Sequence, residues 1–158
     1  MNTRAGALAE QFAAANGELI AAVAGCAAAE WRRPCEGEGR TIGVTAHHVA
    51  MGHAGFAQLL GALVAGQVVP TISPEGLHEM NARHARDHAD IGQAETLDAL
   101  RRNGEDLARA VRGLSDEQLG LATPVFGGRE MSVGQIIELV VIGHPRQHLG
   151  SIRAALGA

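Results

Sequence analysis

Apolar residues recur at steps of three and four along the first part of the chain. Such a series marks one face of a helix, because a helix has 3.6 residues per turn. The series consists of Leu8, Phe12, Ala15, Leu19, Val23 and Cys26. It predicts a first helix over residues 3–28. Residues 34–40, with the sequence PCEGEGR, hold a proline and two glycines and predict a break.

A second apolar series follows this break. Its members are Ile42, Val49, Phe56, Leu60 and Leu63. Thr41 stands before the series, where a hydroxyl side chain can cap a helix, so a second helix is predicted over residues 41–66. Ser73 and Pro74 are typical of the next helix start. We expect one long third helix over residues 74–114, with an interruption near Gly92.

The last part of the chain contains two capping-box patterns. Ser115 with Gln118 predicts a short helical turn, and Ser132 with Gln135 predicts the start of the final helix. A loop is expected over residues 121–131. The stretches PCEGEGRTIG and PVFGGREMSVG share proline, glycines, arginine and a hydroxyl before a helix. They indicate either a weak internal duplication of two helical hairpins or a chance similarity of two glycine-rich loops.

Composition supports helices over sheets. Of the 158 residues, 46% are hydrophobic, 3% are aromatic and none is tyrosine, while alanine is abundant. A chain of this length can bury a core without disulfides or metals. We therefore predict an all-α protein, a four-helix bundle built from two helical hairpins with long connections, and a single domain over residues 1–158.

Charge and cysteine content narrow the partners. The net charge is −4 and the arginines do not cluster beyond pairs, which argues against nucleic-acid binding. No apolar run approaches the length of a membrane span, and no signal peptide is recognised. Cys26 and Cys35 lack metal-type spacing, so a reduced, cytoplasmic protein is expected. The alanine-rich first helix and the histidine stripe of the third favour a homodimer.

Eight histidines form three groups, and their spacing distinguishes them. His144 and His148 are four residues apart on the apolar series of the last helix, so both rings should face the core. Two neighbouring buried rings are unfavourable unless something pairs them, and a shared cation would do so. The alternative is a pair of core histidines bound only by hydrogen bonds. Pro145 predicts a bend beside the pair.

The other histidines offer a third ligand or a competing site. His48 and His53 lie on inward-facing series of the second helix, whereas His47 is expected to be exposed. His84 and His88 form another pair four residues apart, but charged neighbours favour a pocket rim, a dimer contact or plain surface over a closed metal site.

These residues resemble a known family. RTIGVTAHHVA at residues 40–50 and SVGQIIELVVIGHPRQHLGSIR at residues 132–153 resemble the DinB superfamily, which includes DinB-like proteins and the mycothiol-dependent maleylpyruvate isomerase metal-binding domain. NARHA and LSDEQL extend the likeness over nearly the whole chain. The resemblance implies a four-helix bundle that binds a divalent cation, usually zinc or nickel. It implies His48, His144 and His148 as the ligands, although the adjacent His47 and the inserted Pro145 depart from the pattern.

Two functions follow from the resemblance. Three protein ligands leave a coordination position for water or substrate, which is typical of catalytic sites. The first hypothesis is therefore a metal-dependent transferase or isomerase in which the cation activates a low-molecular-weight thiol or water. The second is a non-catalytic metal- or ligand-binding bundle associated with stress. The sequence shows no general acid or base; Glu138 lies off the ligand stripe, and Glu79, Asn81, His84 and His53 are candidates only for a pocket wall.

Overall fold

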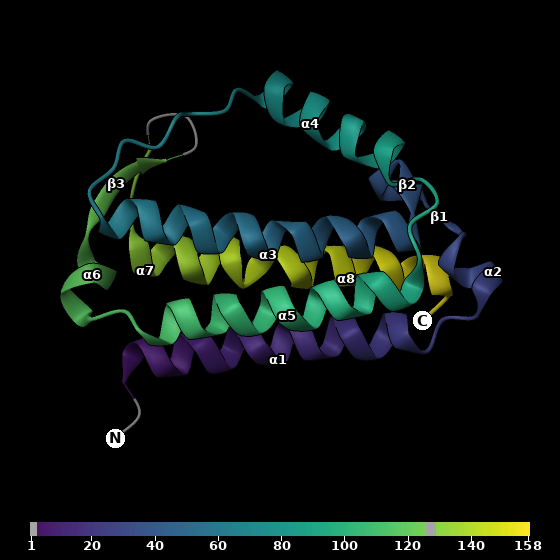
Figure 1. Ribbon diagram of the computed structural model, residues 1–158, viewed down its shortest axis with the longest axis horizontal. Helices are drawn as coiled ribbons and strands as arrows, with labels where there is room; N and C mark the ends of the chain where they lie inside the picture. The colour runs from purple at the N-terminus through teal and green to yellow at the C-terminus, as the bar shows by residue number, and fades with distance from the viewer. Residues whose placement is uncertain (1–2, 126–128) are drawn as a thin grey trace.

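Long helices lying side by side make up the body of the protein. The computed structural model describes residues 3–125 and 129–158. α1 (Arg4–Ala24), α3 (Ile42–Val64) and α5 (Gln93–Arg112) pack together with a last helical segment, as Figure 1 shows. That segment consists of α7 (Val133–Ile136), the π-helical η2 (Ile137–Val141) and α8 (Gly143–Leu156). The all-α class is confirmed.

Hydroxyl side chains start the helices where the sequence predicts them. Thr41, Ser73, Ser115 and Ser132 each accept a hydrogen bond from the backbone N–H three residues ahead. Two of these caps are capping boxes, because Gln118 and Gln135 bond back to the cap backbone. The capping signals of the sequence therefore fix the starts of α3, α4 (Pro74–Asp87), α6 (Asp116–Gly120) and α7.

Two predicted helices are shorter than expected. The first helix ends at Ala24 rather than near residue 28, and a separate turn, α2 (Ala28–Trp31), follows. The expected third helix is two helices, α4 (Pro74–Asp87) and α5, because the chain leaves helical geometry at Gly92, where ψ is 147°. α4 contains no buried residue, and Figure 1 shows it standing apart from the other helices above α3.

Both glycine-rich connections contain small antiparallel hairpins. β1 (Pro34–Cys35) pairs with β2 (Arg40–Thr41) around the 3-10 turn η1 (Glu36–Glu38). β3 (Ala122–Val125) pairs with β4 (Arg129–Ser132), so the prediction of a plain loop over residues 121–131 is wrong. Residues 126–128, part of that expected loop, lie outside the described residues. Each hairpin ends at a capping hydroxyl, so the two similar stretches also have similar structures.

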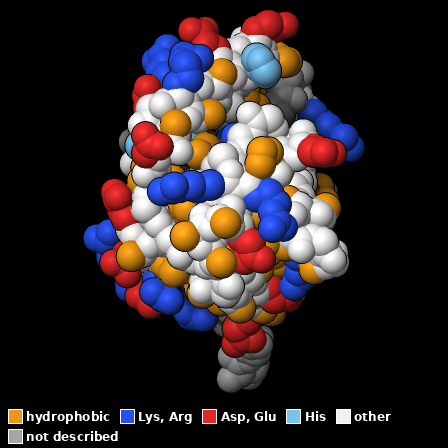
Figure 2. Space-filling model, turned by 90° about the vertical axis from the view of Figure 1, so that its right-hand side faces the viewer, with side chains coloured by type: hydrophobic (Ala, Val, Ile, Leu, Met, Phe, Trp, Pro, Cys, Tyr) orange, Lys and Arg blue, Asp and Glu red, His pale blue; other side chains and the backbone are white. Residues whose placement is uncertain are grey.

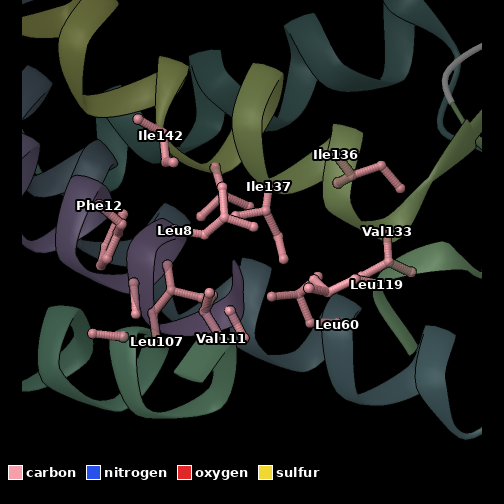
Figure 3. Packing of buried hydrophobic residues seen from close by; sticks show 14 of the residues in the cluster. Leu8, Phe12, Leu60, Leu107, Val111, Leu119, Val133, Ile136, Ile137 and Ile142 are labelled. Atoms are coloured by element: carbon pink, nitrogen blue, oxygen red, sulfur yellow. The ribbon is translucent and has the colours of Figure 1, made fainter. Parts of the chain in front are cut away.

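The core consists of two apolar clusters. One centres on Phe12, Leu107 and Ile137, and its packing appears in Figure 3. The other contains Leu19, Trp31 and Ile152.

The surface gives two further findings. Among residues 3–125 and 129–158, no helix is both long and apolar enough to cross a lipid bilayer. Figure 2 shows arginine and carboxylate side chains interspersed over one end of the molecule, with little histidine visible there.

Candidate metal site

The structure brings together the three histidines that the resemblance singles out. His48 comes from α3, and His144 and His148 come from α8. One ring nitrogen of each lies within 4.8 Å of those of the other two. The Nε2 atoms of His48 and His144 are 3.1 Å apart. Two imidazoles on one tetrahedral zinc have nitrogens about 3.3 Å apart, given bonds of about 2.0 to 2.1 Å. The spacing therefore fits a shared cation.

Glu38 fixes the orientation of His148. Nδ1 of His148 lies 2.8 Å from Oε1 of Glu38, and both side chains are only 9% exposed. An ionised carboxylate can only accept, so Nδ1 carries the proton. In the neutral ring, Nε2 then keeps its lone pair free. A carboxylate behind a histidine in this way is the usual support of a metal ligand.

Arg40 completes this support. Its guanidinium lies 3.0 Å from the other carboxylate oxygen of Glu38. Burial alone would raise the pKa of Glu38, but hydrogen bonds from Arg40 and His148 outweigh burial and leave that pKa below its ordinary value. Glu38 is therefore a carboxylate at neutral pH. Nε of Arg40 is buried without a hydrogen-bond partner among the described residues.

Two of the three triad rings, those of His48 and His144, are neutral at pH 7. Burial, with the charge of Arg40 adding to it, lowers the pKa of His48 to about 2. Burial and the neighbouring His148 lower the pKa of His144 to about 3. Neutral imidazole is the form that binds metals.

Gly52 provides the space for one of these rings. A Cβ at this position would lie 2.7 Å from Cε1 of His144, closer than side chains pack. Glycine at this point of α3 therefore lets α8 bring its ring up to His48. Together, the spacing, the neutral rings and this cradle show that the residues fit a divalent cation.

The helix changes geometry just before the pair. Residues Ile137–Val141 are π-helical, and the N–H of Ile142 bonds to the carbonyl of Ile137 at 2.9 Å. Pro145 follows as the third residue of α8 and is buried. The proline has no N–H to donate to the π segment that precedes it. π segments inside α-helices often accompany functional sites.

The triad lies in the wall of a cavity of about 600 Å³. α4 supplies the opposite side through Leu77, Asn81 and Ala85, and the loop between β1 and β2 supplies Glu38 and Arg40. Among the described lining residues, Glu38 is the only carboxylate. Of the predicted pocket-wall candidates, Asn81 lines this cavity, whereas Glu138 is exposed and pairs with Arg4 at 3.4 Å.

A second histidine cluster lies beside the first. His47 is 6% exposed, so the prediction that it is exposed is wrong. It faces α4, where its Nδ1 is 2.9 Å from Nε2 of His84. The ring of His88 is tilted against both rings, with centroids 4.4 and 4.7 Å away. His84 and His88 were expected at a pocket rim, at a dimer contact or on plain surface. The structure shows both half-buried and in contact with His47 of α3.

His53 and Glu79 do not join either cluster. His53 is fully buried, and its Nε2 lies 2.9 Å from the side-chain oxygen of Asn16. Its ring also packs edge-on against Phe12. Glu79 pairs with Arg83 at 3.6 Å on the exposed side of α4. His53 is thus part of the interior rather than of the candidate site.

Helical spacing does not single out Glu38 and Arg40. Both stand in the stretch EGEGR, which by its glycines predicts only a helix break. The signal was an acid between two glycines beside an arginine. Gly39 has a positive φ of 67°, which turns the chain sharply so that Glu38 and Arg40 reach the same place.

The chain is similar to a known protein family. The family model described as mycothiol maleylpyruvate isomerase N-terminal domain matches residues 12–141. The match includes His48 and stops before His144 and His148. Neither a curated protein nor a solved structure was found that matches the chain. Because the matched residues make up most of the chain, the protein belongs to the family of mycothiol maleylpyruvate isomerase N-terminal domains, within the DinB-like superfamily.

Proposed function

We propose that the protein is a metal-dependent transferase or isomerase that uses a low-molecular-weight thiol. His48, His144 and His148 would hold a divalent cation, and the ligand would occupy the adjoining cavity. The observation that carries the proposal is the meeting of three imidazole nitrogens within 4.8 Å in the wall of a cavity of about 600 Å³. Cavities of roughly 300 to 1,000 Å³ are typical of small-molecule sites.

The ligand set favours zinc or nickel as the cation. Imidazole suits both metals, and three protein ligands leave a position for an exogenous group. When bound, such a cation lowers the pKa of a coordinated water or thiol and so supplies a nucleophile at neutral pH. The family name refers to mycothiol, which supports a thiol rather than water as the activated group.

The residues of the chain would orient the ligand. Nε of Arg40 is buried and unpaired among the described residues, so it can donate to an anionic group of a ligand. Glu38 keeps the proton of His148 on Nδ1, and so keeps the Nε2 lone pair of that ring free. α4 forms one side of the cavity.

A specific observation favours the second candidate, a non-catalytic binding bundle. Glu38 is the only carboxylate among the described cavity residues, and it already accepts from both Arg40 and His148. A carboxylate held in this way is a poor general base. In this alternative, the cation would bind a ligand without turnover.

We also infer a reducing compartment, the cytoplasm, as the place of action. Both cysteines, Cys26 and Cys35, are buried free thiols in the described structure. Burial raises the pKa of each, so neither is an activated nucleophile.

Metal analysis combined with a conjugation assay tests the proposal. Untagged protein should contain the cation, and should conjugate or isomerise electrophiles in the presence of low-molecular-weight thiols. His144→Ala and a chelator should both abolish thiol-dependent turnover. Arg153→Gln, an exposed change on the same helix, is the control. If the triad binds a cation but no electrophile of a broad panel is turned over, the non-catalytic binding bundle is favoured. If neither His48→Ala nor His144→Ala lowers the metal content, the proposed site is rejected.

A further inference from the structure

A second group of three histidines adjoins the triad without belonging to it. His47 of α3 faces His84 and His88 at the end of α4, and one ring nitrogen of each lies within 4.8 Å of those of the other two. The ring centroids are 4.4 to 5.1 Å apart. His47 and His48 are adjacent in the sequence, so neighbouring residues of α3 point into two different clusters.

From this geometry we infer a second divalent-cation site, formed by His47, His84 and His88, that fastens α4 to α3. Three imidazole nitrogens suit a borderline transition metal such as zinc, nickel or copper(II). The inference goes beyond the proposed function and does not depend on it, because it concerns different ligands.

The contact between two of these rings argues for a ligand. Nδ1 of His47 and Nε2 of His84 lie 2.9 Å apart, close to the separation of about 3.3 Å for two nitrogens on one tetrahedral ion. An imidazole binds a metal through one nitrogen, so Nε2 of His84 would be the ligand and the buried Nδ1 would carry the proton of the neutral ring.

The charges around the cluster are compatible with a cation. Burial and the neighbouring imidazoles lower the pKa of both His47 and His84, so their rings are neutral near pH 7. Glu95 acts on His47 and Asp87 acts on His84, which places negative charge close by. Arg40 acts in the opposite sense on His84.

The position of α4 gives the second site its consequence. α4 contributes no buried residue, and its main packing is against α3. The same helix covers the cavity through Leu77, Asn81 and Ala85. Little apolar burial holds it in place, so a metal bond between α3 and α4 would supply the missing attachment. Occupancy of the second site would thus control how firmly the cavity is covered.

The experiment uses His144→Ala, which isolates the second site, and adds zinc. We expect wild-type protein to bind two ions per chain, His144→Ala to bind one, and His144→Ala combined with His84→Ala to bind none. His88→Ala replaces His84→Ala if the latter fails to fold. His78→Ala, an exposed histidine of α4 outside both clusters, serves as the control and should leave the count at two.

Hydrogen exchange provides the structural readout. In His144→Ala, zinc at about 100 times its dissociation constant should slow amide exchange in α4 by up to about 100-fold, because only the attached state binds the ion. The further change His84→Ala should remove this protection. The inference is overturned if His84→Ala and His88→Ala each retain the wild-type count, or if zinc binds without protecting α4. One ion lost in His84→Ala but not in His144→Ala would support this site and reject the triad.

Discussion

Glu38 should control metal affinity without contacting the metal. In Glu38→Gln the side chain keeps its shape and an acceptor oxygen but loses its charge. In the wild type, the Glu38 carboxylate lies 2.8 Å from Nδ1 of His148 and 3.0 Å from the guanidinium of Arg40, and the side chain is 9% exposed. Replacing such a supporting carboxylate lowers metal affinity by about 10- to 100-fold. This corresponds to about 1.4 to 2.7 kcal/mol.

The measurement is a zinc titration against a competing chelator, with Glu36→Gln as the matched control. Glu36 lies two residues away in the same loop and is exposed. The Glu36→Gln variant should bind zinc with the affinity of the wild type. Equal affinities for Glu38→Gln and Glu36→Gln would refute the supporting role of Glu38.

Stability has to be separated from affinity in this experiment. Glu38 and Arg40 form a buried ion pair, and removing one partner of such a pair costs about 3 to 5 kcal/mol. Urea unfolding in chelator would give this loss, and the zinc titration would use conditions in which circular dichroism shows the fold intact. Glu38→Asp retains the charge and should therefore lose less stability and less zinc affinity than Glu38→Gln. A variant that is destabilised but binds zinc normally would assign Glu38 to folding alone.

Three further outcomes are expected. Gly52→Ala should lower zinc affinity at least ~10-fold, because its Cβ would lie 2.7 Å from Cε1 of His144. Gly55→Ala, on the same helix, has open space and should leave the zinc affinity unchanged. Equal affinities of the two variants would show that Gly52 does not provide the space for His144. Burial lowers the pKa of His53 to about 4. As the pH falls below about 6.5, His53 is therefore protonated in the unfolded chain before it is protonated in the folded one. The stability that His53 contributes is complete above about pH 6.5 and is lost as the pH falls toward 4. Urea unfolding in chelator should show about 2 kcal/mol less stability at pH 5 than at pH 8 from His53, and His53→Gln should reduce the difference. Light scattering should show a homodimer, since exposed Leu139 and Met80 offer apolar surface, and a monomer at all concentrations would reject it.

Local signals predicted much of the fold. The four capping hydroxyls mark helix starts because a cap is a short-range hydrogen bond that the sequence alone specifies. The break between α4 and α5 was placed near Gly92, but the sequence did not reveal that α4 leaves the bundle. That separation depends on what α4 packs against, which periodicity does not report.

The candidate site shows the same limit. The i, i+4 spacing on an apolar stripe was enough to point His144 and His148 inward. The exposure of His47 was predicted wrongly because helical angles describe one helix, whereas α4 covers this face of α3. Glu38 reaches His148 across 110 positions of sequence, a contact that spacing within a single element cannot predict.

The π-helical stretch Ile137–Val141 makes the site tolerant of a change in length. It accommodates one residue more than regular α-helix would, without turning the residues that follow it. Deleting one residue within it would therefore return this segment to ordinary winding and leave His144 and His148 facing His48. The same deletion in a regular part of the helix would turn every following side chain by about 100° and separate the three rings.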